Sequence, residues 1–359
     1  MLIIDSHLDL AWNALFDNRD LTLSAYTIRA QEARLAGKGK GQGTVALPEL
    51  RRGRVALCFA TLMARVTGVP TPWIDYRSPP QAYGSALGQM AYYRGLERCG
   101  EIRIIADRAA LDRHVAEWLA WDMLPNADAE PQPPLGFVIS MESADPILDP
   151  SQLGEFCTLG VRVIGPAHYG PGRYAGGTGT QEGLSELGRA LLAEMGHLGV
   201  LLDVSHLSDE AFWQALDAYG GPLLASHNNC RALVPHQRQF SDAQLRAIVA
   251  RGGVVGVAFD VWMLRLGWNA ATHTNTGITL DTVVDHIDHI CQVAGDCEHA
   301  AIGSDLDGLY GREQSPCDLD TIADFQALPG LLSQRGYGDD DIARIMHGNW
   351  LRLLRTSWA

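Results

Sequence analysis

Short apolar segments alternate with amphipathic segments along almost the whole chain, and this alternation limits the possible folds more than any other feature. The apolar segments are rich in Val, Ile, Leu and Ala and do not alternate between polar and apolar residues, which is typical of strands covered on both faces in a parallel sheet. Eight segments have this character: 2–4, 55–63, 135–140, 161–165, 200–205, 222–226, 254–259 and 300–304. Four segments between them show helical periodicity and end at a glycine: 185–199, 208–221, 241–253 and 279–295.

Eight strands that alternate with helices predict an α/β fold, specifically a (β/α)8 TIM barrel. A doubly wound open sheet is the competing architecture, because periodicity alone does not separate the two. The chain has 359 residues, more than the ~250 of a typical barrel. The surplus falls in long loop insertions at 12–54, 64–134 and 264–278 and in a helical C-terminal extension that starts at Asp318. No segment has the composition of a linker, so we predict one domain over residues 1–359.

Charge and composition exclude several classes of partner. The formal net charge is −14, which disfavours nucleic acid and anionic membranes. No apolar segment approaches the roughly 18 residues of a membrane span. The N-terminus, MLIIDSHLDL, lacks the basic region of a signal peptide and fits a first strand. The seven cysteines are scattered and odd in number. We therefore expect a cytoplasmic protein without structural disulfides.

Residues of the types that bind metals or exchange protons directly follow five of the eight apolar segments. They are His7 and Asp9, Glu142, His206, His227 and Asp305. The strands of a parallel barrel all end on the same face, and that face carries the active site. These side chains are therefore expected to converge, although some 300 positions of sequence separate the first from the last.

Histidines and carboxylates in this combination suit Zn²⁺ or a similar divalent ion. His7 and Asp9 are two positions apart, so on a strand they point to the same side and can reach one metal. A lone H-x-D pair is a weak signal, since His7 could equally hydrogen-bond in a core while Asp9 caps a turn. The whole set is more specific, because each buried carboxylate needs a partner and a metal centre supplies one for all.

Seven ordered segments of the chain resemble the signature segments of the membrane (renal) dipeptidases, peptidase family M19, a branch of the amidohydrolase superfamily. They are DSHLDL, MES, LLDVSHLS, LLASHNNCR, HQRQFSD, GSDLDG and GNWLRLL. The resemblance runs from residue 5 to about residue 354 and points to a bacterial-type member. It implies two Zn²⁺ per chain, or two other divalent ions. His7 and Asp9 would bind one ion, His206 and His227 the other, and Glu142 would bridge them.

The resemblance implies roles for three further residues. Asp305 would be the general acid–base residue, His168 would contact the tetrahedral oxyanion, and Arg238 would bind a substrate carboxylate. Without the resemblance, His168 would be interpreted as an unpartnered loop histidine and Arg238 as a solvated surface arginine. The segment after Glu142 reads Ser-Ala-Asp and departs from the Gly-Gly-His type of the mammalian enzymes, so their substrate preference is not carried over.

The predicted function is that of a metallo-dipeptidase whose substrate is a short peptide. A hydroxide between the two metals would attack the scissile carbonyl, and L-Xaa-D-Xaa dipeptides are expected among the substrates. The same centre could instead cleave lactones, cyclic amides or acyl-amino acids, which a substrate panel would reveal. A barrel protein without turnover is a further alternative, which metal analysis and one dipeptide assay would test. The family resemblance also suggests a homodimer.

Overall fold

The computed structural model describes residues 1–68 and 74–358, and nine parallel strands lie within them. Their bounds are β1 (Ile3–Leu8), β2 (Val55–Met63), β3 (Ile102–Ile104), β4 (Leu135–Glu142), β5 (Val161–Gly165), β6 (Leu201–Asp203), β7 (Leu223–Leu224), β8 (Val255–Val257) and β9 (Ala300–Ile302). Each of the eight predicted strand segments overlaps one of these strands, although β1 and β4 extend beyond the predicted segments 2–4 and 135–140. β3 was not predicted.

Eight of these strands form a nearly closed barrel. Neighbouring strands follow the order β7-β6-β5-β4-β2-β1-β9-β8. A single parallel bridge between Ala225 and Val255 joins the two ends of this series. There the Ala225 amide donates to the Val254 carbonyl at 2.9 Å, and the Gly256 amide donates to the Ala225 carbonyl at 2.8 Å. The structure therefore confirms the predicted TIM-like barrel. β3 lies beside this series and pairs with the first residues of β4.

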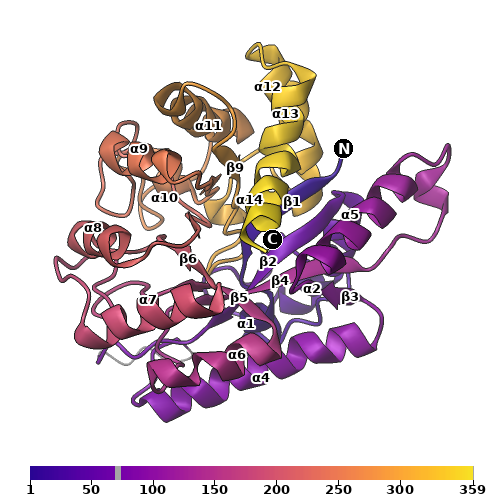
Figure 1. Ribbon diagram of the computed structural model, residues 1–359. Helices are drawn as coiled ribbons and strands as arrows, with labels where there is room; N and C mark the ends of the chain where they lie inside the picture. Colours follow the sequence, from indigo (N-terminus) through magenta and orange to yellow (C-terminus); the bar gives the residue numbers. More distant parts are fainter. Residues whose placement is uncertain (69–73, 359) are drawn as a thin grey trace.

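Helices surround the strands (Figure 1). The first are α1 (Leu10–Leu15), α2 (Ala25–Glu32), α3 (Leu47–Arg52), α4 (Pro79–Arg98), α5 (Arg108–Asp122), α6 (Leu153–Leu159) and α7 (Glu186–Leu198). They are followed by α8 (Asp209–Ala218), α9 (Asp242–Ala250), α10 (Val261–Leu264), α11 (Leu280–Ala294), α12 (Leu328–Gln334), α13 (Asp339–Ala343) and α14 (Asn349–Ser357).

The helices predicted from periodicity are α7, α8, α9 and α11, and their sequences carry the local signals that set their limits. Ser185, Ser208 and Ser241 each accept a hydrogen bond from a backbone amide in the first turn of α7, α8 and α9, which is the usual N-cap interaction. Gly199 and Gly295 end α7 and α11 in the left-handed conformation, where an L side chain would be strained.

The first two long insertions, predicted as loops, contain helices and a strand. Residues 12–54 include most of α1 and all of α2 and α3, whereas residues 64–134 include α4, β3 and α5. Residues 69–73 of the second insertion lie outside the described residues. The predicted helical C-terminus is confirmed as α12, α13, the π-helix Arg344–Gly348 and α14. Its last helix closes one end of the barrel, where Trp350 Nε1 donates to the Ile302 carbonyl of β9 at 2.9 Å.

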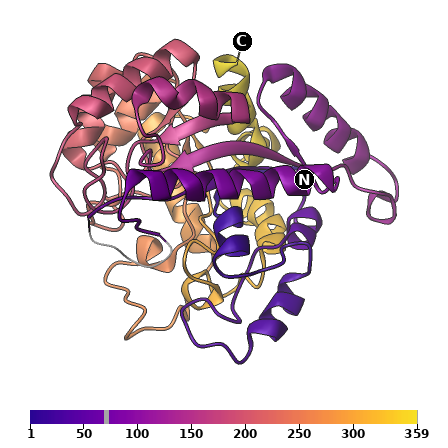
Figure 2. The ribbon, with the colours of Figure 1, turned by 90° about the horizontal axis from the view of Figure 1, so that it is seen from below.

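The segments that follow β1 and β8 gather at the end of the barrel opposite the C-terminus (lower part of Figure 2). These are carboxyl ends of parallel strands, the face that carries function in barrels of this kind. The strands themselves are buried along almost their whole length. Among the described helices, none has the length and hydropathy needed to cross a membrane.

Candidate metal centre

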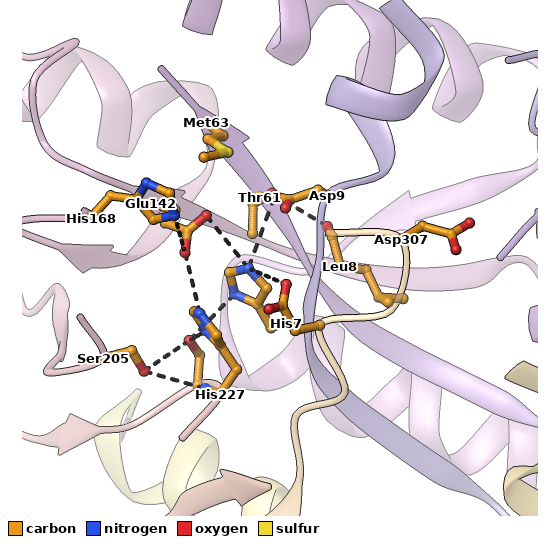
Figure 3. A network of polar contacts seen from close by, with 12 residues as sticks. His7, Leu8, Asp9, Thr61, Met63, Glu142, His168, Ser205, His227 and Asp307 are labelled. Atoms are coloured by element: carbon orange, nitrogen blue, oxygen red, sulfur yellow. Dashed lines mark hydrogen bonds and ion pairs between the residues drawn. The ribbon is translucent and has the colours of Figure 1, made fainter. Parts of the chain in front are cut away.

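The five residues predicted as metal ligands come together at the carboxyl ends of four strands; Figure 3 labels His7, Asp9, Glu142 and His227. His7 belongs to β1 and Asp9 follows it, Glu142 ends β4, and His206 and His227 follow β6 and β7. All five side chains are buried, with exposures between 1% and 7%. They form two overlapping groups that could each hold a metal ion, and Glu142 belongs to both; His7 and His227 also form such a group with Asp305.

The first group consists of His206, His227 and Glu142. The two Nε2 atoms of the histidines are 2.9 Å apart. Glu142 Oε1 lies 3.2 Å from His206 Nε2 and 3.3 Å from His227 Nε2. Zinc bonds of 2.0–2.2 Å in tetrahedral geometry place two ligand atoms roughly 3.4 Å apart. The three atoms are therefore spaced as ligands of one small cation are.

The second group consists of His7, Asp9 and Glu142. His7 Nε2 lies 3.6 Å from Glu142 Oε2 and 3.9 Å from Asp9 Oδ1. These distances are too long for hydrogen bonds. His7 Nε2 is accordingly a buried atom without a hydrogen-bond partner among the described residues. An unsatisfied imidazole nitrogen facing carboxylate oxygens from two strands fits a second divalent ion.

Hydroxyl groups orient these side chains. Ser226 Oγ lies 2.8 Å from His227 Nδ1, and Thr178 Oγ1 lies 3.1 Å from His206 Nδ1. Thr61 donates to Asp9 Oδ1. Such contacts fix ring orientation and leave Nε2 free for a metal. Sequence reasoning missed the hydroxyls of Thr61 and Thr178, because Thr61 lies inside an apolar strand and Thr178 lies in an irregular loop.

Burial controls the charge state of the histidines. Burial, assisted by Arg238, holds the pKa of His206 well below its ordinary value. Burial and the neighbouring His7 do the same for the pKa of His227. Both rings are therefore neutral near pH 7, which is the form that ligates metals.

His7 differs because it faces acids. Burial alone would lower the pKa of His7, but Glu142, Asp9 and Asp305 raise it to about 10. For Glu142, burial opposes ionisation, yet the histidines around it, His7 among them, hold its pKa well below the ordinary value. The acidic side of the centre thus attracts positive charge, which a proton on His7 or a bound cation can supply.

Three strand exits hold non-glycine residues in the left-handed backbone region. The φ angles are 67° at Ser143, 65° at His206 and 59° at Asp305. This conformation costs about 1–3 kcal/mol per residue and persists where the surroundings enforce it, often at functional sites. The fold therefore tolerates strained backbone beside Glu142 and at His206 and Asp305.

The two aspartates of the GSDLDG segment have different surroundings. Asp305 Oδ1 lies 3.8 Å from His7 Nε2. Burial raises the pKa of the Asp305 carboxyl well above its ordinary value. Asp307 instead accepts hydrogen bonds from the backbone amides of Thr44 and Val45 at 2.8–3.0 Å, and in Figure 3 it lies apart from the cluster. Asp305 faces the candidate centre, and Asp307 anchors a loop.

His168 lies beside the candidate ligands, with its Nε2 3.8 Å from Glu142 Oε1. Arg65 Nη1 lies 2.7 Å from His168 Nδ1, and Asp75 accepts from Arg65 Nε at 2.7 Å. A guanidinium can only donate, so His168 Nδ1 accepts and its Nε2 carries the proton. Burial, with Arg65 adding to it, lowers the pKa of His168 to about 3. His168 is thus a neutral N–H donor aimed at the centre, not an unpartnered loop histidine.

Arg238 is buried, with 2% exposure, rather than solvated at the surface. It donates to the His227 carbonyl at 2.8 Å and to Asn228 Oδ1. No ion pair joins it to an acid within residues 1–68 and 74–358, and its Nε has no partner there. A buried guanidinium that has only neutral partners is ready to receive an anion.

A cavity of about 170 Å³ connects these groups. Asp9, Glu142, His168, His206, Arg238 and Asp305 line it, together with Arg65, Tyr169, Asp260, Met63, Met263, Gly308 and Leu309. Sequence reasoning missed Asp260, although the same rule would have found it, since Asp260 directly follows the apolar segment 254–259.

Two histidines on α11 belong to no such cluster. His286 Nδ1 accepts from the backbone amide of Cys230 at 3.2 Å. His289 Nε2 lies 2.8 Å from Asp242 Oδ1. Both have structural partners outside the barrel.

Comparisons with known proteins agree with this geometry. The family model described as "Membrane dipeptidase (Peptidase family M19)" matches residues 1–358. The solved structure of dipeptidase AC, a metallopeptidase of family M19, is similar with a TM-score of 0.79 and 26% identity over 100% of this chain and 99% of that one. A metallopeptidase from Rhodobacter sphaeroides, liganded with a phosphinate mimic of the dipeptide L-Ala-D-Ala, has a TM-score of 0.79 and 25% identity, with the same coverage.

Among curated sequences, an uncharacterized protein of the pqqA 5′ region of Klebsiella pneumoniae is 36% identical over 57% of this chain and 76% of its own length. Dipeptidase tcpJ of Claviceps purpurea is 31% identical over 57% of this chain, but the match spans only 47% of that protein. The match of the family model over nearly the full length decides the assignment. The chain belongs to the membrane dipeptidase family, peptidase family M19, and is an enzyme of the metallo-dipeptidase class.

Proposed function

We propose that the protein hydrolyses dipeptides with two divalent ions, most simply two Zn²⁺ per chain. The observation that carries this proposal is the pair of ligand groups that share Glu142, with Arg238 in the same cavity. His7 and Asp9 would hold one ion, His206 and His227 the other, and Glu142 both. When bound, the ions would lower the pKa of a water molecule and polarise the scissile carbonyl.

The protein's own residues would then bind and protonate the substrate. Arg238 would fix the terminal carboxylate, for which its planar fork is suited. The His168 Nε2–H would donate to the developing oxyanion, and Arg65 keeps that proton in place. Asp305, with its raised pKa, would accept a proton from the attacking water and deliver it to the leaving amine. The cavity of about 170 Å³ favours short substrates.

Metal content provides the direct test. The protein purified without chelators and reconstituted with zinc is expected to carry about two ions per chain. His206→Ala is expected to empty mainly one site, because His206 belongs to only one of the two groups. His289→Ala, which removes a histidine outside the barrel, is the matched control and should keep both ions. Elemental analysis that finds less than one ion per chain in the wild type would exclude the binuclear centre.

The stereochemistry of the substrate follows from where it is held. Attack occurs at the carbonyl of the first residue, so the metal centre constrains that residue, whereas the second is held mainly through its carboxylate. We therefore expect L-Xaa-D-Xaa dipeptides to be cleaved with kcat/KM at least comparable to L-Xaa-L-Xaa. D-Xaa-L-Xaa dipeptides should be poorer by ~10²-fold, because a misplaced carbonyl reacts slowly. The four stereoisomers of Ala-Ala provide the measurement. Preference for a D residue in the first position would contradict this placement.

A further inference from the structure

Asp260 lines the substrate cavity but belongs to neither candidate metal group. It lies three residues after β8, at the N-cap of α10, and is 5% exposed. The side-chain amide of Gln314 donates to both of its carboxylate oxygens, at 2.7 and 2.8 Å, and the Trp262 amide donates to Oδ1 at 3.3 Å. Asp260 is therefore held firmly in one position in the wall of the cavity.

The neighbours of Asp260 leave its charge without a counter-ion. The Gln314 amide and the Trp262 amide are neutral donors, and no ion pair joins Asp260 to a lysine or arginine in the described parts of the chain. Lys38 interacts with Asp260 electrostatically but forms no ion pair with it. A buried carboxylate satisfied by neutral donors still lacks compensation for its charge. A cationic group that entered the cavity would supply it.

The loop that carries Asp260 is fastened to the segment that carries Arg238. Gln239 Nε2 donates to the Met263 carbonyl at 2.7 Å. The rings of His236 and Trp262 are in edge contact with centroids 5.0 Å apart. Asp260 thus lies on the Arg238 side of the cavity, whereas Asp9 enters from β1.

Position and charge together define a subsite. We infer that Asp260 selects dipeptides whose second residue has a cationic side chain, such as lysine or ornithine. The inference rests on the proposed function, in which Arg238 holds the carboxylate of that second residue. The side chain leaves from the carbon that bears this carboxylate, so it is the part of the substrate that meets the adjoining wall. There Asp260 would form a charge-assisted hydrogen bond with the ammonium group.

Paired substrates and a single conservative variant test the inference. Ala-Lys and Ala-norleucine differ mainly in the terminal ammonium, and each is used with the chirality at the second residue that the enzyme cleaves better. The wild type is expected to prefer Ala-Lys by about tenfold in kcat/KM, the effect of one charge-assisted hydrogen bond. In Asp260→Asn the ratio should fall to about one, with Ala-norleucine cleaved within about threefold of the wild type. Asparagine keeps the N-cap of α10.

Asp217→Asn removes the same charge from the exposed surface of α8 and should leave the preference unchanged. A wild type that cleaves both substrates equally, or a preference that survives in Asp260→Asn, would overturn the inference while leaving the dipeptidase function intact. Equal loss on both substrates would also overturn it, since it would indicate a structural role. If Asp260→Asn changed the ratio of kcat/KM for Lys-Ala and norleucine-Ala but not that for Ala-Lys and Ala-norleucine, Asp260 would contact the side chain of the first residue. That result would also overturn the inference. If neither peptide is cleaved, the proposed function itself fails, and the inference with it.

Discussion

Asp305→Asn is expected to lose at least ~10²-fold in kcat while the protein keeps its metal content, the scale typical of a general acid–base group. Asp305 lines the cavity and lies 3.8 Å from His7. Asparagine has the same shape and tolerates the left-handed conformation at this position. The substitution therefore removes the proton-carrying carboxyl with little disturbance of the fold. Steady-state kinetics combined with elemental analysis measures both quantities.

Asp307→Asn is the matched control for this experiment. It lies two residues away and is also left-handed, but its carboxylate holds the backbone at Thr44 and Val45. We expect Asp307→Asn to lower the free energy of unfolding with kcat per folded molecule largely retained. If Asp305→Asn kept most of its activity, a different group would have to move the proton.

Arg238→Met is expected to reduce kcat/KM for a free dipeptide by at least ~10²-fold, because two charge-assisted hydrogen bonds to the carboxylate are lost. The effect should be small for the corresponding dipeptide amide, which has no terminal carboxylate. Arg231→Met is a fitting control, since Arg231 belongs to the same segment but pairs with Asp209 at 2.7 Å, outside the cavity. Equal losses on the acid and the amide would show that Arg238 does not bind that group.

The sequence predicted the barrel strands well because each is a buried apolar run, and it failed where tertiary packing decides. β3 is only three residues long and contains Arg103, so no apolar run marks it. α4 begins with two prolines and contains Gly84, Gly88 and Gly95, residues typical of loops. The buried side chains of α4, such as Met90 and Tyr93, supply the packing that overrides these weak propensities.

The part of the candidate site that could be predicted consists of residues at or just after the carboxyl ends of barrel strands. His7, Glu142 and His227 are adjacent in space because parallel strands end on one face. This rule can be applied without knowing how the side chains pack. The groups that orient them were not predictable. The Arg65–His168 contact joins two irregular segments, and no local pattern indicates which loops will meet.

The uneven lengths of the strands have a consequence for how the barrel opens. β2 and β4 are joined at seven consecutive positions, from Leu57–Gly136 to Met63–Glu142. Among the described residues, β6 and β7 share two register pairs, the Ala225–Val255 bridge joins β7 to β8, and the pair Asp5–Ile302 joins β1 to β9. Transient openings will therefore concentrate away from the β2–β4 pair, and amide hydrogens of β6 to β9 will exchange with solvent sooner than those of β2. His206 and His227 follow β6 and β7, so an ion bound by both side chains would join two of these weakly paired strands.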